Sequence, residues 1–187
     1  MKKILLGAFV AMATTAGAHA EGLYVGVAAG GTQFDVYCRG TGSCDKSGTG
    51  FKLHSGYKLT ENVAVEAHYA DYGKAGFGGM INGVNAIGDA KLSGFGLGVA
   101  LLRNFSTDWS GVVRAGVARN KLKADASVPG FSFSDFENKT KGYIGAGIGY
   151  KLTKEVSLNA AIDYTEGQFA GDKAKVALYT IGVSYAF

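Results

Sequence analysis

Apolar residues alternate with small or polar residues along most of the chain. Counting back by twos from Phe187, the residues are apolar or aromatic as far as Ala177, whereas those between them are smaller and more polar. Because successive side chains of a strand point to opposite faces, this period of two predicts β-strands. Seven further segments show the same pattern: 23–27, 51–57, 63–69, 95–101, 109–117, 144–150 and 156–164. The sequence therefore predicts an all-β chain of eight strands.

A short turn motif repeats between these strands. Residues 57–63 (YKLTENV) are echoed by residues 150–156 (YKLTKEV) and, more loosely, by residues 104–109, at intervals of 46 and 47 residues between Thr60, Ser106 and Thr153. One interval fits two strands, one short turn and one longer loop. The predicted hairpins are 22–57, 63–102, 109–150 and 156–187, and the predicted long loops are 35–48, 73–89, 121–139 and 166–173.

The first twenty residues are typical of an export signal. Lys2 and Lys3 precede an apolar run at 4–16, and Ala18-His19-Ala20 fits a cleavage site, so the expected mature chain is 21–187. The apolar run is shorter than the roughly 20 residues of a membrane-spanning helix. Later segments lack an apolar run of about 18 residues. Two options follow: a soluble exported protein, or a barrel in an outer membrane.

Composition favours the barrel. Only 18% of residues are charged, 30 are Gly and the net charge is +4, which argues against a disordered chain and against nucleic-acid binding. The smaller alternating set is mostly Gly, Ala and Ser, whereas a water-facing strand is usually richer in Lys, Glu and Thr. Aromatic residues gather near strand ends, as in an interfacial girdle: Tyr57, Trp109, Tyr150, Tyr164, Tyr185 and Phe187. We therefore expect an eight-stranded antiparallel up-and-down transmembrane β-barrel, with apolar residues facing lipid.

The last strand resembles the terminal strand of bacterial outer-membrane barrels. The resemblance implies that the barrel-assembly machinery recognises it and that periplasmic chaperones accompany the exported chain. The residues of this assembly signal are Tyr179, Ile181, Val183, Tyr185 and Phe187.

Further segments resemble strands one to five of the OmpA-type barrel family. They are 22–26 (GLYVG), 50–57 (GFKLHSGY), 62–69 (NVAVEAHY), 92–96 (LSGFG), and 109–110 together with 114–119 (RAGVAR). The resemblance covers nearly all of residues 22–187. Because the chain ends with the barrel, it does not imply the peptidoglycan-binding domain of full-length OmpA.

Five ionisable residues fall on the faces expected to point inward: Glu66, Arg114, Lys52, His68 and Asp163. Buried charges must be paired, because removing them from water is costly. An eight-stranded barrel has room for little besides side chains. Two interpretations stay open: a plug of ion pairs, or a narrow gated ion path. In the OmpA-type family an inward Glu and Arg form such a network, which Glu66 and Arg114 match.

Candidate chemistry outside this interior is sparse. Cys38 and Cys44 lie in the first predicted loop, and export to an oxidising compartment predicts a disulfide. Metal binding is the rival, but only His54 and His68 remain in the expected mature chain to complete a site. Small barrel lipid A deacylases use a His and a Ser two positions apart, whereas Ser55 directly follows His54. We expect neither a cofactor nor an enzymatic activity.

The predicted loops carry apolar residues that either pack together, insert at the lipopolysaccharide boundary or contact an extracellular ligand. Lys121, Lys123 and Lys173 lie near the expected outer rim, where lipid phosphates are found. The leading hypothesis is a monomeric outer-membrane protein with a structural or surface-interaction role, surrounded by lipid and lipopolysaccharide and not binding nucleic acid. The alternatives are a low-conductance pore and a soluble periplasmic lipocalin-like carrier.

Overall fold

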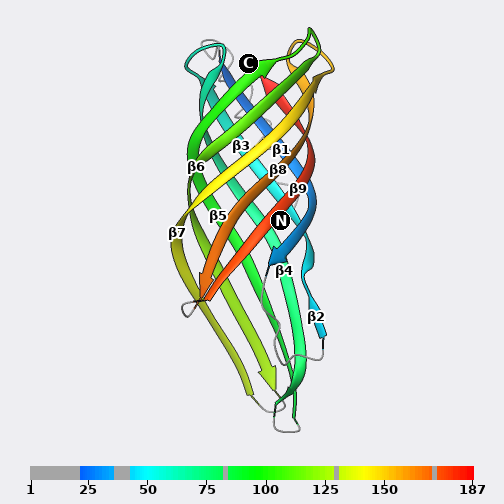
Figure 1. Cartoon of the computed structure of the whole chain (residues 1–187), viewed down its shortest axis with the longest axis vertical. Coiled ribbons are helices and arrows are strands. Elements are labelled where there is room, and N and C mark those ends of the chain that lie inside the picture. Colours follow the sequence, from blue (N-terminus) through cyan, green and yellow to red (C-terminus); the bar gives the residue numbers. More distant parts are fainter. Residues whose placement is uncertain (1–21, 36–42, 82–83, 129–130, 170–171) are drawn as a thin grey trace, which may run out of the picture.

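The computed structural model describes residues 22–35, 43–81, 84–128, 131–169 and 172–187, and these form antiparallel strands (Figure 1). The strands are β1 (Leu23–Asp35), β2 (Ser43–Asp45), β3 (Ser47–Lys58), β4 (Val63–Ile81), β5 (Val84–Asn104), β6 (Trp109–Val128), β7 (Phe131–Lys151), β8 (Val156–Phe169) and β9 (Asp172–Ala186). None of the described residues belongs to a helix that is long and apolar enough to cross a membrane.

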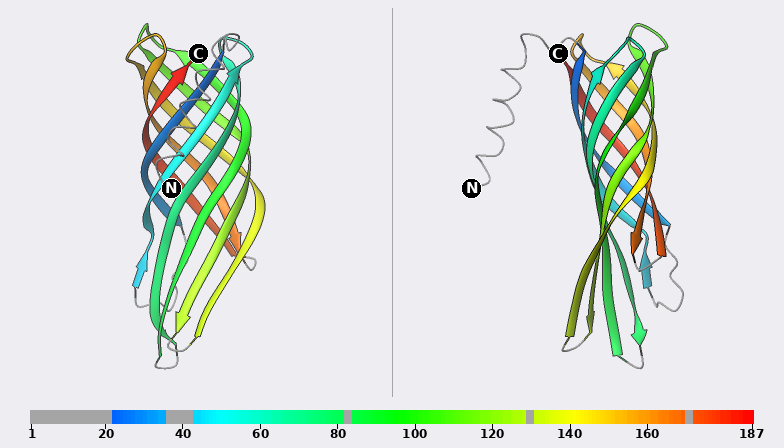
Figure 2. Two further views of the ribbon diagram at one scale, coloured as in Figure 1. Left: turned by 180° about the vertical axis from the view of Figure 1, so that it is seen from behind. Right: turned by 90° about the vertical axis from the view of Figure 1, so that its left-hand side faces the viewer.

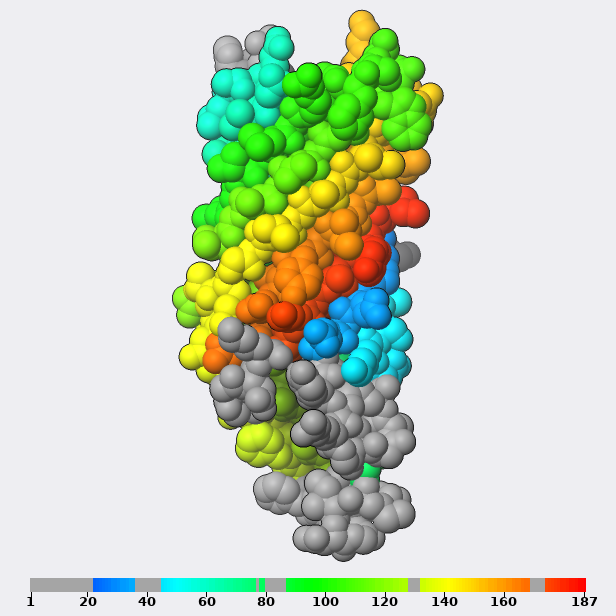
Figure 3. All heavy atoms as spheres, in the orientation of Figure 1, coloured from blue at the N-terminus to red at the C-terminus, as the bar shows by residue number. Residues whose placement is uncertain are grey.

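Eight long strands close into a barrel, as predicted. Each pairs with its neighbours along the chain, β1 pairs with β9, and the short β2 pairs with the outer part of β4. In Figure 3, strands β7, β8, β9 and β1 cross one face as adjacent oblique bands. Closure matters because an unpaired strand edge in lipid would leave backbone donors and acceptors without hydrogen bonds.

Three short turns lie at one end of the barrel, together with the C-terminus (Figure 1). The repeated hydroxyl explains their shared form. The amides of Val63, Trp109 and Val156 donate to the side-chain oxygens of Thr60, Ser106 and Thr153 at 3.1, 3.1 and 3.0 Å. Each hydroxyl therefore satisfies a backbone amide where the chain reverses. We call this the short-turn end and the other the long-hairpin end.

Three of the predicted long loops, 73–89, 121–139 and 166–173, are wrong, because most of their residues belong to paired strands. The β4–β5 hairpin continues to Ile81↔Val84 and the β6–β7 hairpin to Val128↔Phe131. Both extend well beyond the ends of β8 and β9 (Figure 2). The predicted loop 35–48 likewise contains β2 and the start of β3, and most of 166–173 belongs to β8 and β9. The pairing continues this far because β5 also pairs with β6 as far as Ile87↔Ser127, which joins the two hairpins into one four-stranded sheet.

The two faces of the wall differ as the alternation predicts. Large apolar side chains on the outer face are strongly exposed, for example Val117 at 56%, Ile144 at 60% and Ile181 at 67%. A water-soluble protein would bury such residues, whereas a barrel in lipid presents them to hydrocarbon.

The substitution Ile181→Lys tests this assignment. It places a charge midway along the outward face of β9, and we expect it to destabilise the barrel by about 2–4 kcal/mol. The measurement is the guanidinium unfolding midpoint in liposomes. The matched control is Ile87→Lys, at a residue of the β4–β5 hairpin that is 70% exposed. Equal effects of the two substitutions would contradict a lipid-facing Ile181.

Candidate functional site

A salt bridge between Glu66 of β4 and Arg114 of β6 crosses the barrel interior. Arg114 Nε donates to Glu66 Oε2 at 2.6 Å, and the hydroxyl of Tyr24 on β1 donates to Glu66 Oε1. Glu66 and Arg114 are only 3% and 8% exposed. Three strands that lie far apart in the sequence thus contribute to one network, in which both oxygens of a buried carboxylate accept hydrogen bonds.

A second ion pair lies in the same interior. Lys52 Nζ on β3 is 2.6 Å from Asp163 Oδ1 on β8, and both side chains are buried. His68 is also buried and stacks edge-on against Tyr143, with 4.3 Å between ring centroids. The structure therefore places all five inward-predicted residues in the interior and joins four of them in two pairs. His68 belongs to neither of the pairs found among the described residues.

Glycine on the neighbouring strands makes room for these side chains. A Cβ atom added at Gly96 would collide with the His68 ring, and one at Gly145 would collide with the Asp163 carboxylate. Gly96 and Gly145 lie directly opposite His68 and Asp163 in the strand registers. The Gly-x-Gly runs are therefore a packing requirement of the charged interior.

An apolar cluster fills the interior toward the long-hairpin end, which the alternation along the chain did not predict. It contains Phe34, Tyr72, Leu92, Leu122, Val176 and Leu178, all at most 6% exposed. The assumption that large apolar residues face lipid hid these residues, because they occupy inward positions. The visible signal was that Val176 and Leu178 are large, unlike Gly182 and Ser184 on the same face of the strand.

A polar cavity of about 120 Å³ occupies the interior at the short-turn end. Glu66 and Arg114 line it together with His54, Ser184 and Asn159. Asn159 Nδ2 donates to Ser184 Oγ at 2.7 Å, and Ser184 Oγ lies 3.4 Å from His54 Nε2. From the short-turn end outward, the interior thus passes from a polar cavity through ion pairs to an apolar cluster.

The contact between Ser184 and His54 does not form a catalytic triad. In such a triad a carboxylate accepts the second ring N–H of the histidine and orients it. His54 Nδ1 has no hydrogen-bond partner within the described part of the chain. Ser55 follows His54 in β3 and so lies on the opposite face of the strand.

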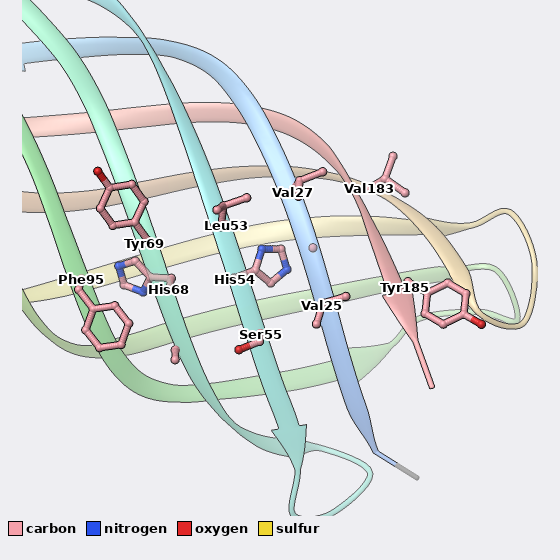
Figure 4. Close-up of a pocket in the computed structure, with 12 residues that line it drawn as sticks. Val25, Val27, Leu53, His54, Ser55, His68, Tyr69, Phe95, Val183 and Tyr185 are labelled. Atoms are coloured by element: carbon pink, nitrogen blue, oxygen red, sulfur yellow. The ribbon is translucent and has the colours of Figure 1, made fainter. Parts of the chain in front are cut away.

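The outer wall carries an apolar groove of about 450 Å³ (Figure 4). It exists because Ser55 and Ala67, which lie directly opposite each other on β3 and β4, are small. Figure 4 shows Tyr69 and Phe95 at one end of the groove and Tyr185 at the other. The groove could not be predicted from the sequence, because residues of five strands line it.

The other residues singled out in the sequence either lie on the outer surface or are not among the described residues. Cys38 is not among the described residues, and Cys44 is described only as part of the backbone of β2, so the disulfide stays a prediction. The residues of the assembly signal in β9 point outward. They are Tyr179, Ile181, Val183 and Tyr185. Phe187 follows β9; its amide donates to the Leu23 carbonyl at 2.9 Å, and its ring stacks on Tyr185. The predicted export signal, residues 1–20, lies outside the described residues and stays a prediction.

This architecture is shared with known outer-membrane proteins. A family model described as "Outer membrane protein beta-barrel domain" matches residues 4–187. An uncharacterized protein from Haemophilus influenzae is 29% identical over 116 residues, which are 60% of this chain and 62% of that protein. The chain therefore spans less than two thirds of the length of this curated relative.

Solved structures share the fold. The chain is similar to OprG of Pseudomonas aeruginosa, with a TM-score of 0.60 and 18% identity over 90% of this chain and 97% of OprG. It is similar to the Neisserial surface protein NspA, with a TM-score of 0.60 and 16% identity over 89% and 98% of the two chains. Ail of Yersinia pestis, solved with the heparin analogue sucrose octasulfate, gives a TM-score of 0.58 and 22% identity over 88% and 99%.

The substitution Arg114→Ala tests the first ion pair. It leaves the buried Glu66 carboxylate without its cation, and we expect a loss of about 3–5 kcal/mol in the free energy of unfolding. The measurement is the guanidinium unfolding midpoint of the refolded barrel. Arg103→Ala, at an exposed residue of β5, is the control and is expected to change little. An unchanged midpoint for Arg114→Ala would refute the structural role of the pair.

Proposed function

Because the chain belongs to the outer membrane protein β-barrel domain family, and is an integral outer-membrane barrel, we propose that it acts through its outer surfaces and not through its lumen. Its role in this proposal is structural or surface-interactive: a closed barrel holds the long hairpins outside the cell. The observation that carries the proposal is the buried apolar cluster across the long-hairpin half of the interior.

The order of layers inside the barrel supports a closed lumen. An ion entering from the short-turn end would reach the Glu66–Arg114 and Lys52–Asp163 pairs, whose charges already neutralise one another. Beyond them it would have to pass Tyr72, Leu92 and Leu178, which are at most 2% exposed. Moving an ion into such an apolar layer without new ligands is costly, and apolar constrictions close pores by excluding water.

The long hairpins supply the surface for interactions. Ile87, Phe133 and Phe136 lie in the β4–β5 and β6–β7 hairpins and are 70%, 49% and 53% exposed. These side chains are therefore accessible to a partner on both faces of the hairpins. We include an extracellular ligand of the hairpins in the proposal, together with lipid and lipopolysaccharide around the wall. The Ail structure with a sulfated sugar shows that another barrel of this fold binds a polyanion.

The chain acts as a monomer, without cofactor, nucleic acid or catalysis. The barrel-assembly machinery and periplasmic chaperones act on it during biogenesis through the outward residues of β9. The low-conductance pore is the second candidate, favoured by the polar cavity at the short-turn end. The soluble carrier is wrong, because the chain belongs to an integral outer-membrane family and exposes its apolar face.

Planar-bilayer recording tests the closed lumen. We expect the refolded wild-type protein to give no discrete openings, and the double substitution Leu92→Ser/Leu178→Ser to give them, because it hydrates the apolar layer. The control is Leu97→Ser/Leu158→Ser, at two outward residues. Reproducible openings of the wild-type barrel would instead favour the pore.

A further inference from the structure

The groove on the outer wall belongs to a continuous row of residues that crosses six strands. Val183, Val27, Leu53, Tyr69, Phe95 and Arg119 lie opposite one another in turn on β9, β1, β3, β4, β5 and β6. The first five line the groove, and the sixth is a cation. One row of directly paired residues therefore leads from the apolar groove to a positive charge.

The row climbs across the membrane-facing wall. Val183 lies three residues before the end of β9, and Arg119 lies ten residues after the start of β6. Both of these strand ends belong to the short-turn end (Figure 1). Because the strands are tilted, the groove begins near the short-turn end and rises toward the long-hairpin end. In outer-membrane barrels short turns face the periplasm, so Arg119 lies on the side of the outer leaflet.

Several cations surround the upper end of this row on the outer face. Lys121 lies two residues beyond Arg119 on β6, and Lys74, Lys91 and Lys123 lie opposite one another on β4, β5 and β6. Like charges placed opposite one another in a sheet repel. Their concentration here therefore points to a recognition site for negative charge.

Three of these five cations, the lysines at 74, 91 and 123, already form ion pairs with carboxylates. Lys74 pairs with Asp89 at 3.1 Å, Lys91 with Asp71 at 2.8 Å, and Lys123 with Asp125 at 2.8 Å. In keeping with this, the hydrogen bond from Lys123 lowers the pKa of Asp125. Arg119 and Lys121 form no ion pair with any of the described residues, and Lys121 Nζ lies 4.1 Å from the centre of the Phe136 ring. They are therefore the two cations available to an external anion.

We propose that this face binds one phosphorylated, acylated glycolipid of the outer leaflet, the lipid A part of lipopolysaccharide. A phosphate contacts Arg119 and Lys121, and one acyl chain lies in the groove past Phe95, Tyr69 and Leu53 (Figure 4). The groove selects a hydrocarbon chain because its lining is almost entirely apolar, and the guanidinium of Arg119 offers paired N–H donors to phosphate oxygens. The site rests on the outer-membrane location and is independent of whether the lumen is closed.

Native mass spectrometry of the protein extracted from outer membranes tests the site. The purified barrel is titrated with bisphosphorylated lipid A, with enzymatically dephosphorylated lipid A, and with inorganic phosphate. We expect the wild type to prefer the phosphorylated lipid. We expect Arg119→Gln/Lys121→Gln to weaken binding of that lipid by about 10- to 30-fold and to abolish the preference. The control is Arg103→Gln/Lys154→Gln, an exposed Arg and Lys at the short-turn end.

The groove has its own pair of variants. Ala67→Phe fills the groove and is expected to weaken binding of both forms of lipid A by similar factors. The control Ala146→Phe, outward on β7 and away from the groove, is expected to leave binding unchanged. Slower migration of the unfolded form on electrophoresis verifies that each variant is folded. Equal effects of the two charge pairs, or of the two phenylalanines, would overturn the proposal. Competition by inorganic phosphate at millimolar concentration would also overturn it, since the site would then recognise a free anion.

Discussion

The structure depends on the hydrogen-bonded seam between the first and last long strands. β1 pairs with β9 from Tyr24↔Ala186 to Asp35↔Lys175, and this pairing turns a sheet into a wall without an edge. A membrane supplies no water for unpaired amides and carbonyls, so closure is what permits this chain to reside in lipid. The aromatic end of the chain contributes directly, because the Phe187 amide donates to the Leu23 carbonyl at the start of β1.

Closure also fixes what the interior must contain. Eight strands leave a narrow lumen that side chains can fill. A large inward residue therefore needs a small residue opposite it on the neighbouring strand. Glycine opposite His68 and Asp163 meets this need for the polar middle of the barrel. Toward the long-hairpin end, Gly50 leaves room for Leu178 and Gly167 leaves room for Leu92, and both leucines belong to the buried apolar cluster. Beyond the polar cavity at the short-turn end, the lumen is thus occupied first by ion pairs and then by apolar side chains.

The tilt that accompanies closure gives the outer wall its own organisation. Rows of directly opposed residues run obliquely, so a single row joins Val183 near the short-turn end to Arg119 on the outer-leaflet side. Apolar residues that contact hydrocarbon and cations that contact headgroups are therefore parts of one continuous surface. The carboxylates of Asp71, Asp89 and Asp125 limit the repulsion between the lysines on this surface.

The sequence by itself determined the strands, their inward and outward faces, the short turns and the membrane setting, because these follow from a period of two and from local hydroxyl–amide bonds. It also identified the inward charges, since Glu66 and Arg114 interrupt a face of small residues. Only the tertiary structure decided which charges pair, where the hairpins end, and that apolar side chains close the lumen. It likewise created the groove beside Ser55 and its continuity with Arg119. The physical reason is that pairing partners and cavities depend on the register between strands distant in sequence, which alternation along a single strand does not specify.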